Sequence, residues 1–204
     1  MTPEQIDNLA WDKQQGLLPA IVQDANDHRV LMLGYMDRAA LDATLATGRV
    51  TFYSRSKQRL WMKGESTGNV LALVSLEADC DGDTLLVQAR PAGPTCHLDR
   101  PSCFAGAPAA FLPQLDALVA RRERERPEGS YSTRLFTDGT RRIAQKVGEE
   151  GVETALAAVA QDDAALLGEA ADLAFHLLVL LRSRGLGLAD VEAVLRDRHA
   201  AATR

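Results

Sequence analysis

The residues best suited to metal chemistry fall within one short stretch, residues 79–103. All three cysteines of the protein lie there, together with one histidine and four carboxylates. Thiolates suit a soft ion such as zinc, whereas carboxylates suit a hard ion such as magnesium. The stretch therefore predicts a metal centre, against the alternative of buried cysteines that pack as small hydrophobes beside a solvated acidic turn. The candidate ligands are Asp79, Cys80, Asp81, Asp83, Cys96 and Cys103.

A second acidic group occurs in the C-terminal half. Glu150 and Glu153 are three residues apart, and Glu169 and Asp172 repeat this spacing, so each predicted helix presents two carboxylates on one face. The pairs are equally distant from Gln161 along the chain, so an antiparallel hairpin turning there brings them together. Four facing carboxylates repel one another unless cations lie between them. The group predicts a magnesium site in a helical bundle, against the alternative of solvated helix faces.

Residues 54–69 are rich in cations, hydroxyls and glycines and precede the acidic turn. Arginine side chains and exposed backbone amides bind phosphate well, so the stretch is a candidate phosphate site. The alternative is a solvated basic loop, and Trp61 within it either stacks on a base or belongs to the core. The candidate substrate contacts are Arg55, Lys57, Arg59, Lys63, Ser66, Thr67 and Asn69.

The elements that position these residues change character along the chain. Short apolar runs separated by polar turns predict a β-rich first half with one main helix. Asp37 is placed to cap that helix and Gly48 to end it. The acidic residues 79–83 lie between two strands and predict a hairpin turn. The expected strands are residues 18–22, 30–33, 50–53, 70–76 and 84–89, and the expected helix is 37–46.

Helical periodicity takes over after a segment rich in glycine, proline and alanine. A β-rich half followed by an all-helical half predicts two domains, an α+β domain and an all-α helical bundle. The predicted domains are residues 1–105 and 113–204, joined by a linker at 106–112. The expected helices comprise one with the stripe Leu115, Leu118 and Val119, followed by residues 140–159, 164–182 and 189–199.

The composition excludes several classes of protein. A net charge of −5 and a pI near 5.4 argue against general nucleic-acid binding. The apolar run at residues 177–181 is too short to span a bilayer, and the N-terminal residues have no pattern typical of a secretory signal. An odd number of cysteines fits a reducing compartment, where clustered cysteines more often bind metal than form disulfides. We therefore expect a cytoplasmic protein without membrane or nucleic-acid partners.

The first half contains a series of spaced motifs, Ser54-Arg55-Ser56 with Leu60-Trp61, Lys63-Gly64-Glu65 with Gly68-Asn69, Asp79-Cys80-Asp81-Gly82-Asp83, Cys96-His97 and Ser102-Cys103-Phe104. Together these motifs closely resemble phosphoribosyl-AMP cyclohydrolase. Two positions depart from the family pattern, because the hydroxyls of Ser66-Thr67 stand in swapped order and Leu98-Asp99 replace an expected Thr-Gly.

The second half contains the motifs Tyr131-Ser132-Thr133 with Leu135-Phe136, Lys146-Val147-Gly148-Glu149-Glu150 with Glu153, and Glu169-Ala170-Ala171-Asp172 with His176. These motifs are similar to those of phosphoribosyl-ATP pyrophosphohydrolase, a family that belongs with the all-α nucleotide pyrophosphohydrolases of the MazG type. In this order the two halves resemble the fused bifunctional enzyme of histidine biosynthesis, which acts on small-molecule nucleotides.

The first resemblance implies that Cys80, Cys96 and Cys103 hold zinc, with Cys80 contributed by the partner subunit of a homodimer. Three protein ligands leave the fourth position open for a water whose pKa zinc lowers. This zinc-activated water would open the adenine ring of phosphoribosyl-AMP at N1–C6. His97 is implied as the proton shuttle, and Glu65 is a weaker candidate.

The three aspartates of the acidic turn resemble the magnesium ligands of the cyclohydrolase family. They do not fit an EF-hand, because the twelfth position counted from Asp79 is Arg90 rather than glutamate. The second resemblance implies that the helical half acts first and releases pyrophosphate from phosphoribosyl-ATP, with Lys146 in contact with phosphate. The implied magnesium ligands of that half are Glu150, Glu153, Glu169 and Asp172.

Two rival interpretations remain open at this point. In one, the chain is a fusion in which one half has lost its activity, although nothing in the ligand sets favours this. In the other, the chain is a zinc-stabilised binding module with a helical dimerisation domain. A structural zinc usually takes four protein ligands, and the chain has only three cysteines, so this second interpretation requires His97 as a ligand.

Overall fold

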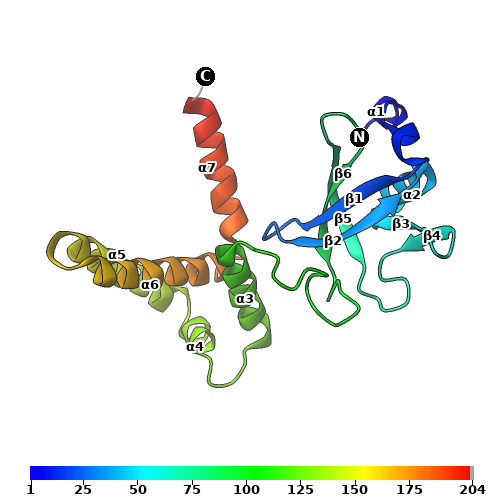
Figure 1. Ribbon diagram of the computed structural model, residues 1–204. Coiled ribbons are helices and arrows are strands. Elements are labelled where there is room, and N and C mark those ends of the chain that lie inside the picture. The colour runs from blue at the N-terminus through cyan, green and yellow to red at the C-terminus, as the bar shows by residue number, and fades with distance from the viewer. Residues whose placement is uncertain (203–204) are drawn as a thin grey trace. The chain divides into compact units, whose positions relative to one another are not determined.

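The computed structural model of the chain describes residues 1–202 and divides into two compact units, Met1–Ala110 and Phe111–Arg204. The first unit is β-rich with one main helix, and the second consists of helices (Figure 1). The predicted combination of an α+β and an all-α domain is therefore confirmed.

A four-stranded sheet forms the centre of the first unit. The strands follow the order β2-β1-β6-β5, in which β1 and β6 run parallel and the other neighbours run antiparallel. Strands β3 and β4 form a separate antiparallel hairpin. Backbone hydrogen bonds connect this hairpin to β5; for example, the Val50 N–H donates to the Leu71 oxygen at 2.9 Å. The strands are β1 Leu18–Asp24, β2 Val30–Met36, β3 Thr51–Ser54, β4 Arg59–Met62, β5 Leu71–Ala78 and β6 Leu85–Pro91.

The main helix, α2 (Arg38–Thr47), has the ends that the sequence predicts. The Asp37 carboxylate accepts the Ala40 N–H at 2.7 Å, and Gly48 adopts a left-handed φ of 65° just past the last turn. Alternate residues of β1 pack inward, since Leu18, Ala20 and Val22 are fully buried. Strands and helix thus share one apolar core, which fixes the turn between β5 and β6.

The N-terminal segment contains two short helices that the sequence analysis did not assign, α1 (Pro3–Asp7) and the 3₁₀ helix η1 (Trp11–Gln14). A reciprocal capping box between Thr2 and Gln5 begins α1, and Ile6 is buried. The Ala10 N–H donates to the Gly82 oxygen at 2.9 Å. This hydrogen bond ties the N-terminal segment to the acidic turn.

The second unit is built on the antiparallel hairpin of α5 and α6. Its turn falls where the carboxylate spacing predicts, because α5 ends at the C-cap Gln161 and the Asp162 carboxylate caps α6 by accepting the Ala165 N–H at 2.9 Å. Helix α3 begins at Phe111, within the range expected for the linker, and α4 was not expected. The helices are α3 Phe111–Glu125, α4 Tyr131–Asp138, α5 Thr140–Ala160, α6 Asp163–Arg182 and α7 Leu188–Ala202.

Helix α6 is long and apolar enough to cross a bilayer by length and composition, with a mean hydropathy of 1.8. A single helix of this kind is weak evidence for a membrane span, because core helices of soluble proteins pass the same test. In this protein α6 packs along α5 and contributes Val179 to a core cluster with Val119 and Ile143.

A buried ion pair joins three helices of this unit. The Asp116 carboxylate on α3, 6% exposed, accepts the Arg182 Nε–H at 2.8 Å and a second guanidinium hydrogen bond. It also accepts the Leu188 N–H at the start of α7 at 3.1 Å. Each partner depends on the other, because a buried charge that loses its partner is costly.

We expect Asp116→Ala to lower the free energy of unfolding of the helical unit by about 2–3 kcal/mol. The change leaves the Arg182 guanidinium and the Leu188 N–H without the carboxylate that accepts their hydrogen bonds. Far-UV circular dichroism in urea follows this unit, and the fluorescence of Trp11 and Trp61 follows the first unit. The fluorescence midpoint should stay unchanged. Arg196→Ala, which breaks the exposed pair with Glu192, is the control and should cost at most about 0.5 kcal/mol. Equal effects of the two variants would contradict the buried-pair interpretation.

Candidate active sites

The acidic turn joins β5 to β6 as predicted. The Asp79 Oδ1 accepts the N–H groups of Asp83 and Thr84 at 3.0 and 3.1 Å, and Gly82 supplies a left-handed φ of 72°. These local bonds fold the turn so that one oxygen each of Asp79, Asp81 and Asp83 lie within 4.8 Å of one another. Three hard oxygen donors at this spacing suit a divalent cation.

Lys13, on η1, reaches this acidic turn from the N-terminal segment. Its Nζ lies 2.5 Å from the Asp81 Oδ2 and 3.2 Å from the Asp83 Oδ2. These hydrogen bonds raise the pKa of Lys13, and the ammonium lowers the pKa of Asp81. The sequence analysis did not single out Lys13, because the two partners are far apart along the chain.

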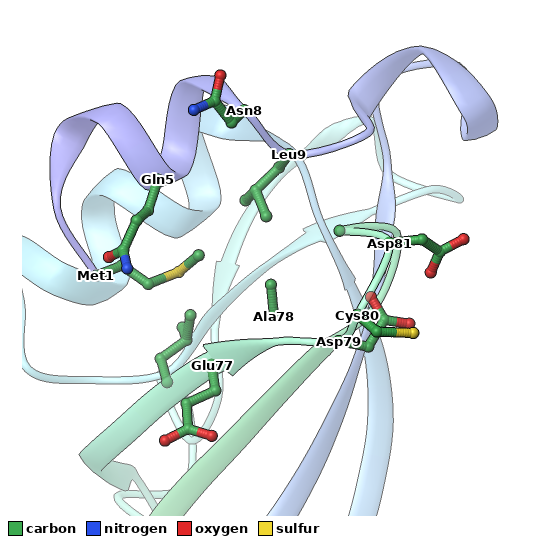
Figure 2. Close-up of a pocket in the computed structure, with 11 residues that line it drawn as sticks. Met1, Gln5, Asn8, Leu9, Glu77, Ala78, Asp79, Cys80 and Asp81 are labelled. Atoms are coloured by element: carbon green, nitrogen blue, oxygen red, sulfur yellow. The ribbon is translucent and has the colours of Figure 1, made fainter.

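Cys80 belongs to the same turn and lines a cavity of about 790 Å³ between the turn and the N-terminal segment. Figure 2 shows its thiol and the Asp81 carboxylate pointing to one side of the turn, away from Met1 and Gln5. Cys80 is exposed, and it has no partner cysteine within a shared ligand group among the described residues. A single chain therefore does not assemble the predicted three-cysteine site.

Cys96 and Cys103 lie together at a second cavity of about 320 Å³. The two thiols are close enough for each to influence the pKa of the other. The Leu98 N–H points at the Cys96 sulfur at 3.5 Å and lowers its pKa, assisted by Arg100, whereas burial and then Cys96 raise the pKa of Cys103. Cys103 is anchored to β2 by its N–H, which donates to the Leu31 oxygen at 2.8 Å. The pair thus offers two soft ligands for a metal ion.

Most of the predicted substrate residues of the first half surround this second cavity. Arg55, Lys57 and Arg59 are not among its lining residues, and Arg55 instead lies over the Tyr35 ring at 3.8 Å. Trp61 packs against the core, which is one of its two expected roles, and it also lines the cavity. The other predicted residues at this cavity are Lys63, Glu65, Ser66, Thr67, Asn69, His97, Cys96 and Cys103.

Glu65 is held by Arg59 rather than left free in the cavity. The Arg59 Nη2 lies 2.6 Å from the Glu65 Oε1, and this hydrogen bond lowers the pKa of the carboxyl. The preceding Gly64 has a φ of 84°, and a Cβ there would collide with the Asn69 backbone, so the loop closes tightly. An ionised Glu65 is suited to accept a proton or orient a donor rather than to donate one.

Asp99 explains one departure from the cyclohydrolase pattern. It stands where glycine was expected, and its φ of 60° lies in the left-handed region that favours glycine. Aspartate tolerates this conformation better than most residues. The Asp99 N–H donates to the Cys96 oxygen at 3.1 Å, and the Cys96 N–H donates to the Arg100 oxygen at 3.0 Å.

The helical hairpin brings three of its four predicted carboxylates into one group. Oxygens of Glu150, Glu169 and Asp172 lie within 4.8 Å of one another, and Glu150 is only 5% exposed. Glu153 is outside this trio, yet desolvation, followed by the charges of Glu150 and Glu169, raises its pKa. The cluster is therefore short of positive charge, and a divalent cation would relieve the repulsion.

Lys146 and His176 flank the cluster at the end away from the turn. The Lys146 Nζ lies 2.9 Å from Glu149 and 3.0 Å from Glu150, which raises its pKa. The buried His176 contacts the Asp172 backbone oxygen through Nδ1 at 2.9 Å and the Tyr131 hydroxyl through Nε2 at 2.9 Å. Glu149 is a further neighbour that the sequence analysis did not predict as a site residue.

Each half of the chain matches a known protein family. A family model for phosphoribosyl-AMP cyclohydrolase matches residues 32–105, and one for phosphoribosyl-ATP pyrophosphohydrolase matches residues 112–199. A histidine biosynthesis bifunctional protein of Xanthomonas axonopodis pv. citri is 69% identical over 97% of this chain and 96% of its own length.

The chain belongs to this bifunctional cyclohydrolase–pyrophosphohydrolase family. A relative of the same description from Escherichia coli is 56% identical over 98% of this chain and 99% of its own length. Another, from Shewanella oneidensis, is 55% identical over 100% of this chain and 97% of its own length. The resemblance inferred from the motifs is therefore confirmed along nearly the whole chain.

The raised pKa of Glu153 predicts how the metal-free protein responds to pH. The folded state favours protonated Glu153, so its charged form reduces stability at neutral pH and this effect is lost as the pH falls through the raised pKa. In EDTA, Glu153→Gln should therefore melt at a higher temperature than the wild type near neutral pH. The difference should disappear toward about pH 4.

Thermal melts followed by circular dichroism across this pH range test the prediction. Glu192→Gln is the matched control, because its carboxylate is on α7 and pairs with Arg196 at 2.9 Å outside the cluster. This control should melt at or slightly below the wild-type temperature. A stabilisation by Glu153→Gln that stays constant with pH would contradict the assignment.

Proposed function

We propose that the chain catalyses two successive hydrolytic steps of histidine biosynthesis. The helical unit releases pyrophosphate from phosphoribosyl-ATP, and the β-rich unit then opens the adenine ring of the resulting phosphoribosyl-AMP at N1–C6. The observation that carries this proposal is the pair of family matches in one chain, at residues 32–105 and 112–199. Each matched range also contains three carboxylates whose spacing suits a divalent cation.

In the helical unit, the carboxylate cluster binds the triphosphate of the substrate through magnesium. Magnesium, when bound, neutralises the phosphate oxygens and activates a water. Lys146 contacts phosphate, and its fixed ion pair with Glu150 supports this role by holding the ammonium beside the cluster. The proposed ligands are Glu150, Glu153, Glu169 and Asp172.

In the β-rich unit, Cys96 and Cys103 of one chain bind zinc together with Cys80 of a second copy. Zinc, when bound with an open fourth position, supplies an activated water for ring opening. His97 transfers protons at the second cavity, and the ionised Glu65 orients it or accepts a proton in its place. The turn aspartates Asp79, Asp81 and Asp83 bind magnesium next to this site.

The nucleotide binds across the second cavity. Lys63, Ser66, Thr67 and Asn69 line it and are suited to hold phosphate and ribose groups. Arg55, Lys57 and Arg59 lie outside its lining and are proposed to contact the phosphate from the rim. We place the catalytic domains at residues 1–105 and 113–204, in a cytoplasmic protein without membrane or nucleic-acid partners.

A homodimer is the proposed assembly. The separation of Cys80 from the cysteine pair supports it, because one chain alone supplies only two of the three thiols to a common site. The helical hairpin supports it independently, since Val159 is 88% exposed and Leu167 is 69% exposed. Apolar side chains this exposed favour a second surface that covers them.

Cys103→Ser tests the ring-opening site. It should reduce ring opening by more than about a hundredfold, because loss of a ligand exceeds the effect of changing its supporting residues. Pyrophosphate release from phosphoribosyl-ATP should stay at the wild-type rate, so phosphoribosyl-AMP should accumulate. Both products are followed in one incubation, and ring opening that survives the change would exclude a catalytic role for the cysteines.

Glu153→Gln tests the helical site and should give the reverse pattern. Pyrophosphate release should fall by more than about a hundredfold, since the magnesium site loses a charge. Ring opening of phosphoribosyl-AMP supplied directly should be unaffected. Glu192→Gln serves as the control, and undiminished pyrophosphate release by Glu153→Gln would exclude the cluster as the active site.

A further inference from the structure

Lys13 places a positive charge between two of the proposed magnesium ligands. It lies in the N-terminal segment, before the residues 32–105 that match the cyclohydrolase family model. Its Nζ contacts one oxygen each of Asp81 and Asp83, at 2.5 and 3.2 Å. Among the residues that the structure describes, no other cation pairs with these two carboxylates.

The backbone around Lys13 is fixed beside the acidic turn. The Ala10 N–H bonds to the Gly82 oxygen at 2.9 Å, and Trp11 packs against the core while its Nε1–H donates to the Ile6 oxygen at 3.0 Å. The Lys13 ammonium thus lies at the end of a flexible side chain, whereas the backbone of η1 is held in place. A charged group tethered this closely has a high effective concentration at the turn.

The Asp79 Oδ1 is already engaged by two backbone N–H groups, so Asp81 and Asp83 are the freer donors for a divalent cation at this turn. Lys13 contacts one oxygen of each of these two carboxylates. Magnesium binds carboxylate oxygens at about 2.0–2.1 Å, so a cation held by Asp81 and Asp83 would lie close to the ammonium and be repelled by it. The ammonium therefore opposes metal binding unless the Lys13 side chain moves away.

We propose that Lys13 is an internal counterion of the acidic turn that competes with its divalent cation. While the cation is absent, the Lys13 ammonium offsets part of the negative charge of Asp81 and Asp83 and keeps the turn, which includes Cys80, in its folded shape. When the cation binds, the ammonium is displaced toward solvent. This inference rests on the proposed magnesium site at the turn, and it makes Lys13 a positioning residue rather than a catalytic one.

The test is Mn²⁺ binding by the zinc-loaded full-length chain, followed by electron paramagnetic resonance. Glu169→Gln and Asp172→Asn are present in every sample to weaken binding at the helical cluster. Lys13→Met should lower the Mn²⁺ dissociation constant on the order of tenfold, and Lys13→Gln should lower it similarly. Arg38→Met is the matched control, because Arg38 pairs with Asp7 of the same N-terminal segment at 2.7 Å without touching the turn.

A second readout separates competition from simple damage to the turn. In the metal-free protein, prepared with EDTA that is then removed, Lys13→Met should lower the melting temperature followed by tryptophan fluorescence. Mn²⁺ added to this EDTA-free protein should raise the melting temperature of the variant by more than that of the wild type. Unchanged or weaker Mn²⁺ binding by both lysine variants would overturn the inference while leaving the magnesium site in place. Asp83→Asn, with Lys13 unchanged, tests the turn itself. If this variant binds Mn²⁺ as tightly as the chain that keeps Asp83, the turn is not a metal site, and both the magnesium site at the turn and the role of Lys13 are wrong.

Discussion

Repulsion between like charges held at close range is the constraint on which both proposed sites depend. Three carboxylates converge at the turn between β5 and β6, and three more converge between α5 and α6. The protein offers one ammonium to each group, Lys13 at the turn and Lys146 at the hairpin. One positive charge does not balance three negative ones, so each group retains an attraction for a further cation. The surrounding folds hold the carboxylates together in spite of this repulsion.

The parts of the fold that follow from local rules were predictable from the sequence. A carboxylate cap and a left-handed glycine mark the two ends of α2. Helical periodicity and the spacing of the carboxylates predict the α5–α6 hairpin and its turn at Gln161. The carboxylate cluster followed from that hairpin, because residues equally distant from a turn must face each other. Glu153 is not among the three residues whose oxygens lie within 4.8 Å of one another, although the charges of Glu150 and Glu169 act on it.

The features that were missed depend on contacts between distant parts of the chain. Lys13 and Asp81 are 68 residues apart, and no local pattern links a short 3₁₀ turn to a β-hairpin. Helices as short as α1 and α4 carry too little periodicity to be recognised. The three cysteines lie close together in sequence, yet the strand β6 between them sends Cys80 and Cys96 to different cavities.

The parallel pairing of β1 with β6 has a consequence for how the protein is made. Ala20 pairs with Leu85, so the central strands of the sheet cannot meet until most of the first unit has left the ribosome. Contacts between residues this far apart in the sequence form slowly, whereas the α5–α6 hairpin forms from segments that are adjacent in the sequence. During synthesis, the β-rich unit is therefore exposed as an incomplete sheet for longer than the helices that follow it. Proline substitutions or truncations before β6 would prolong this exposure and favour aggregation of the nascent chain.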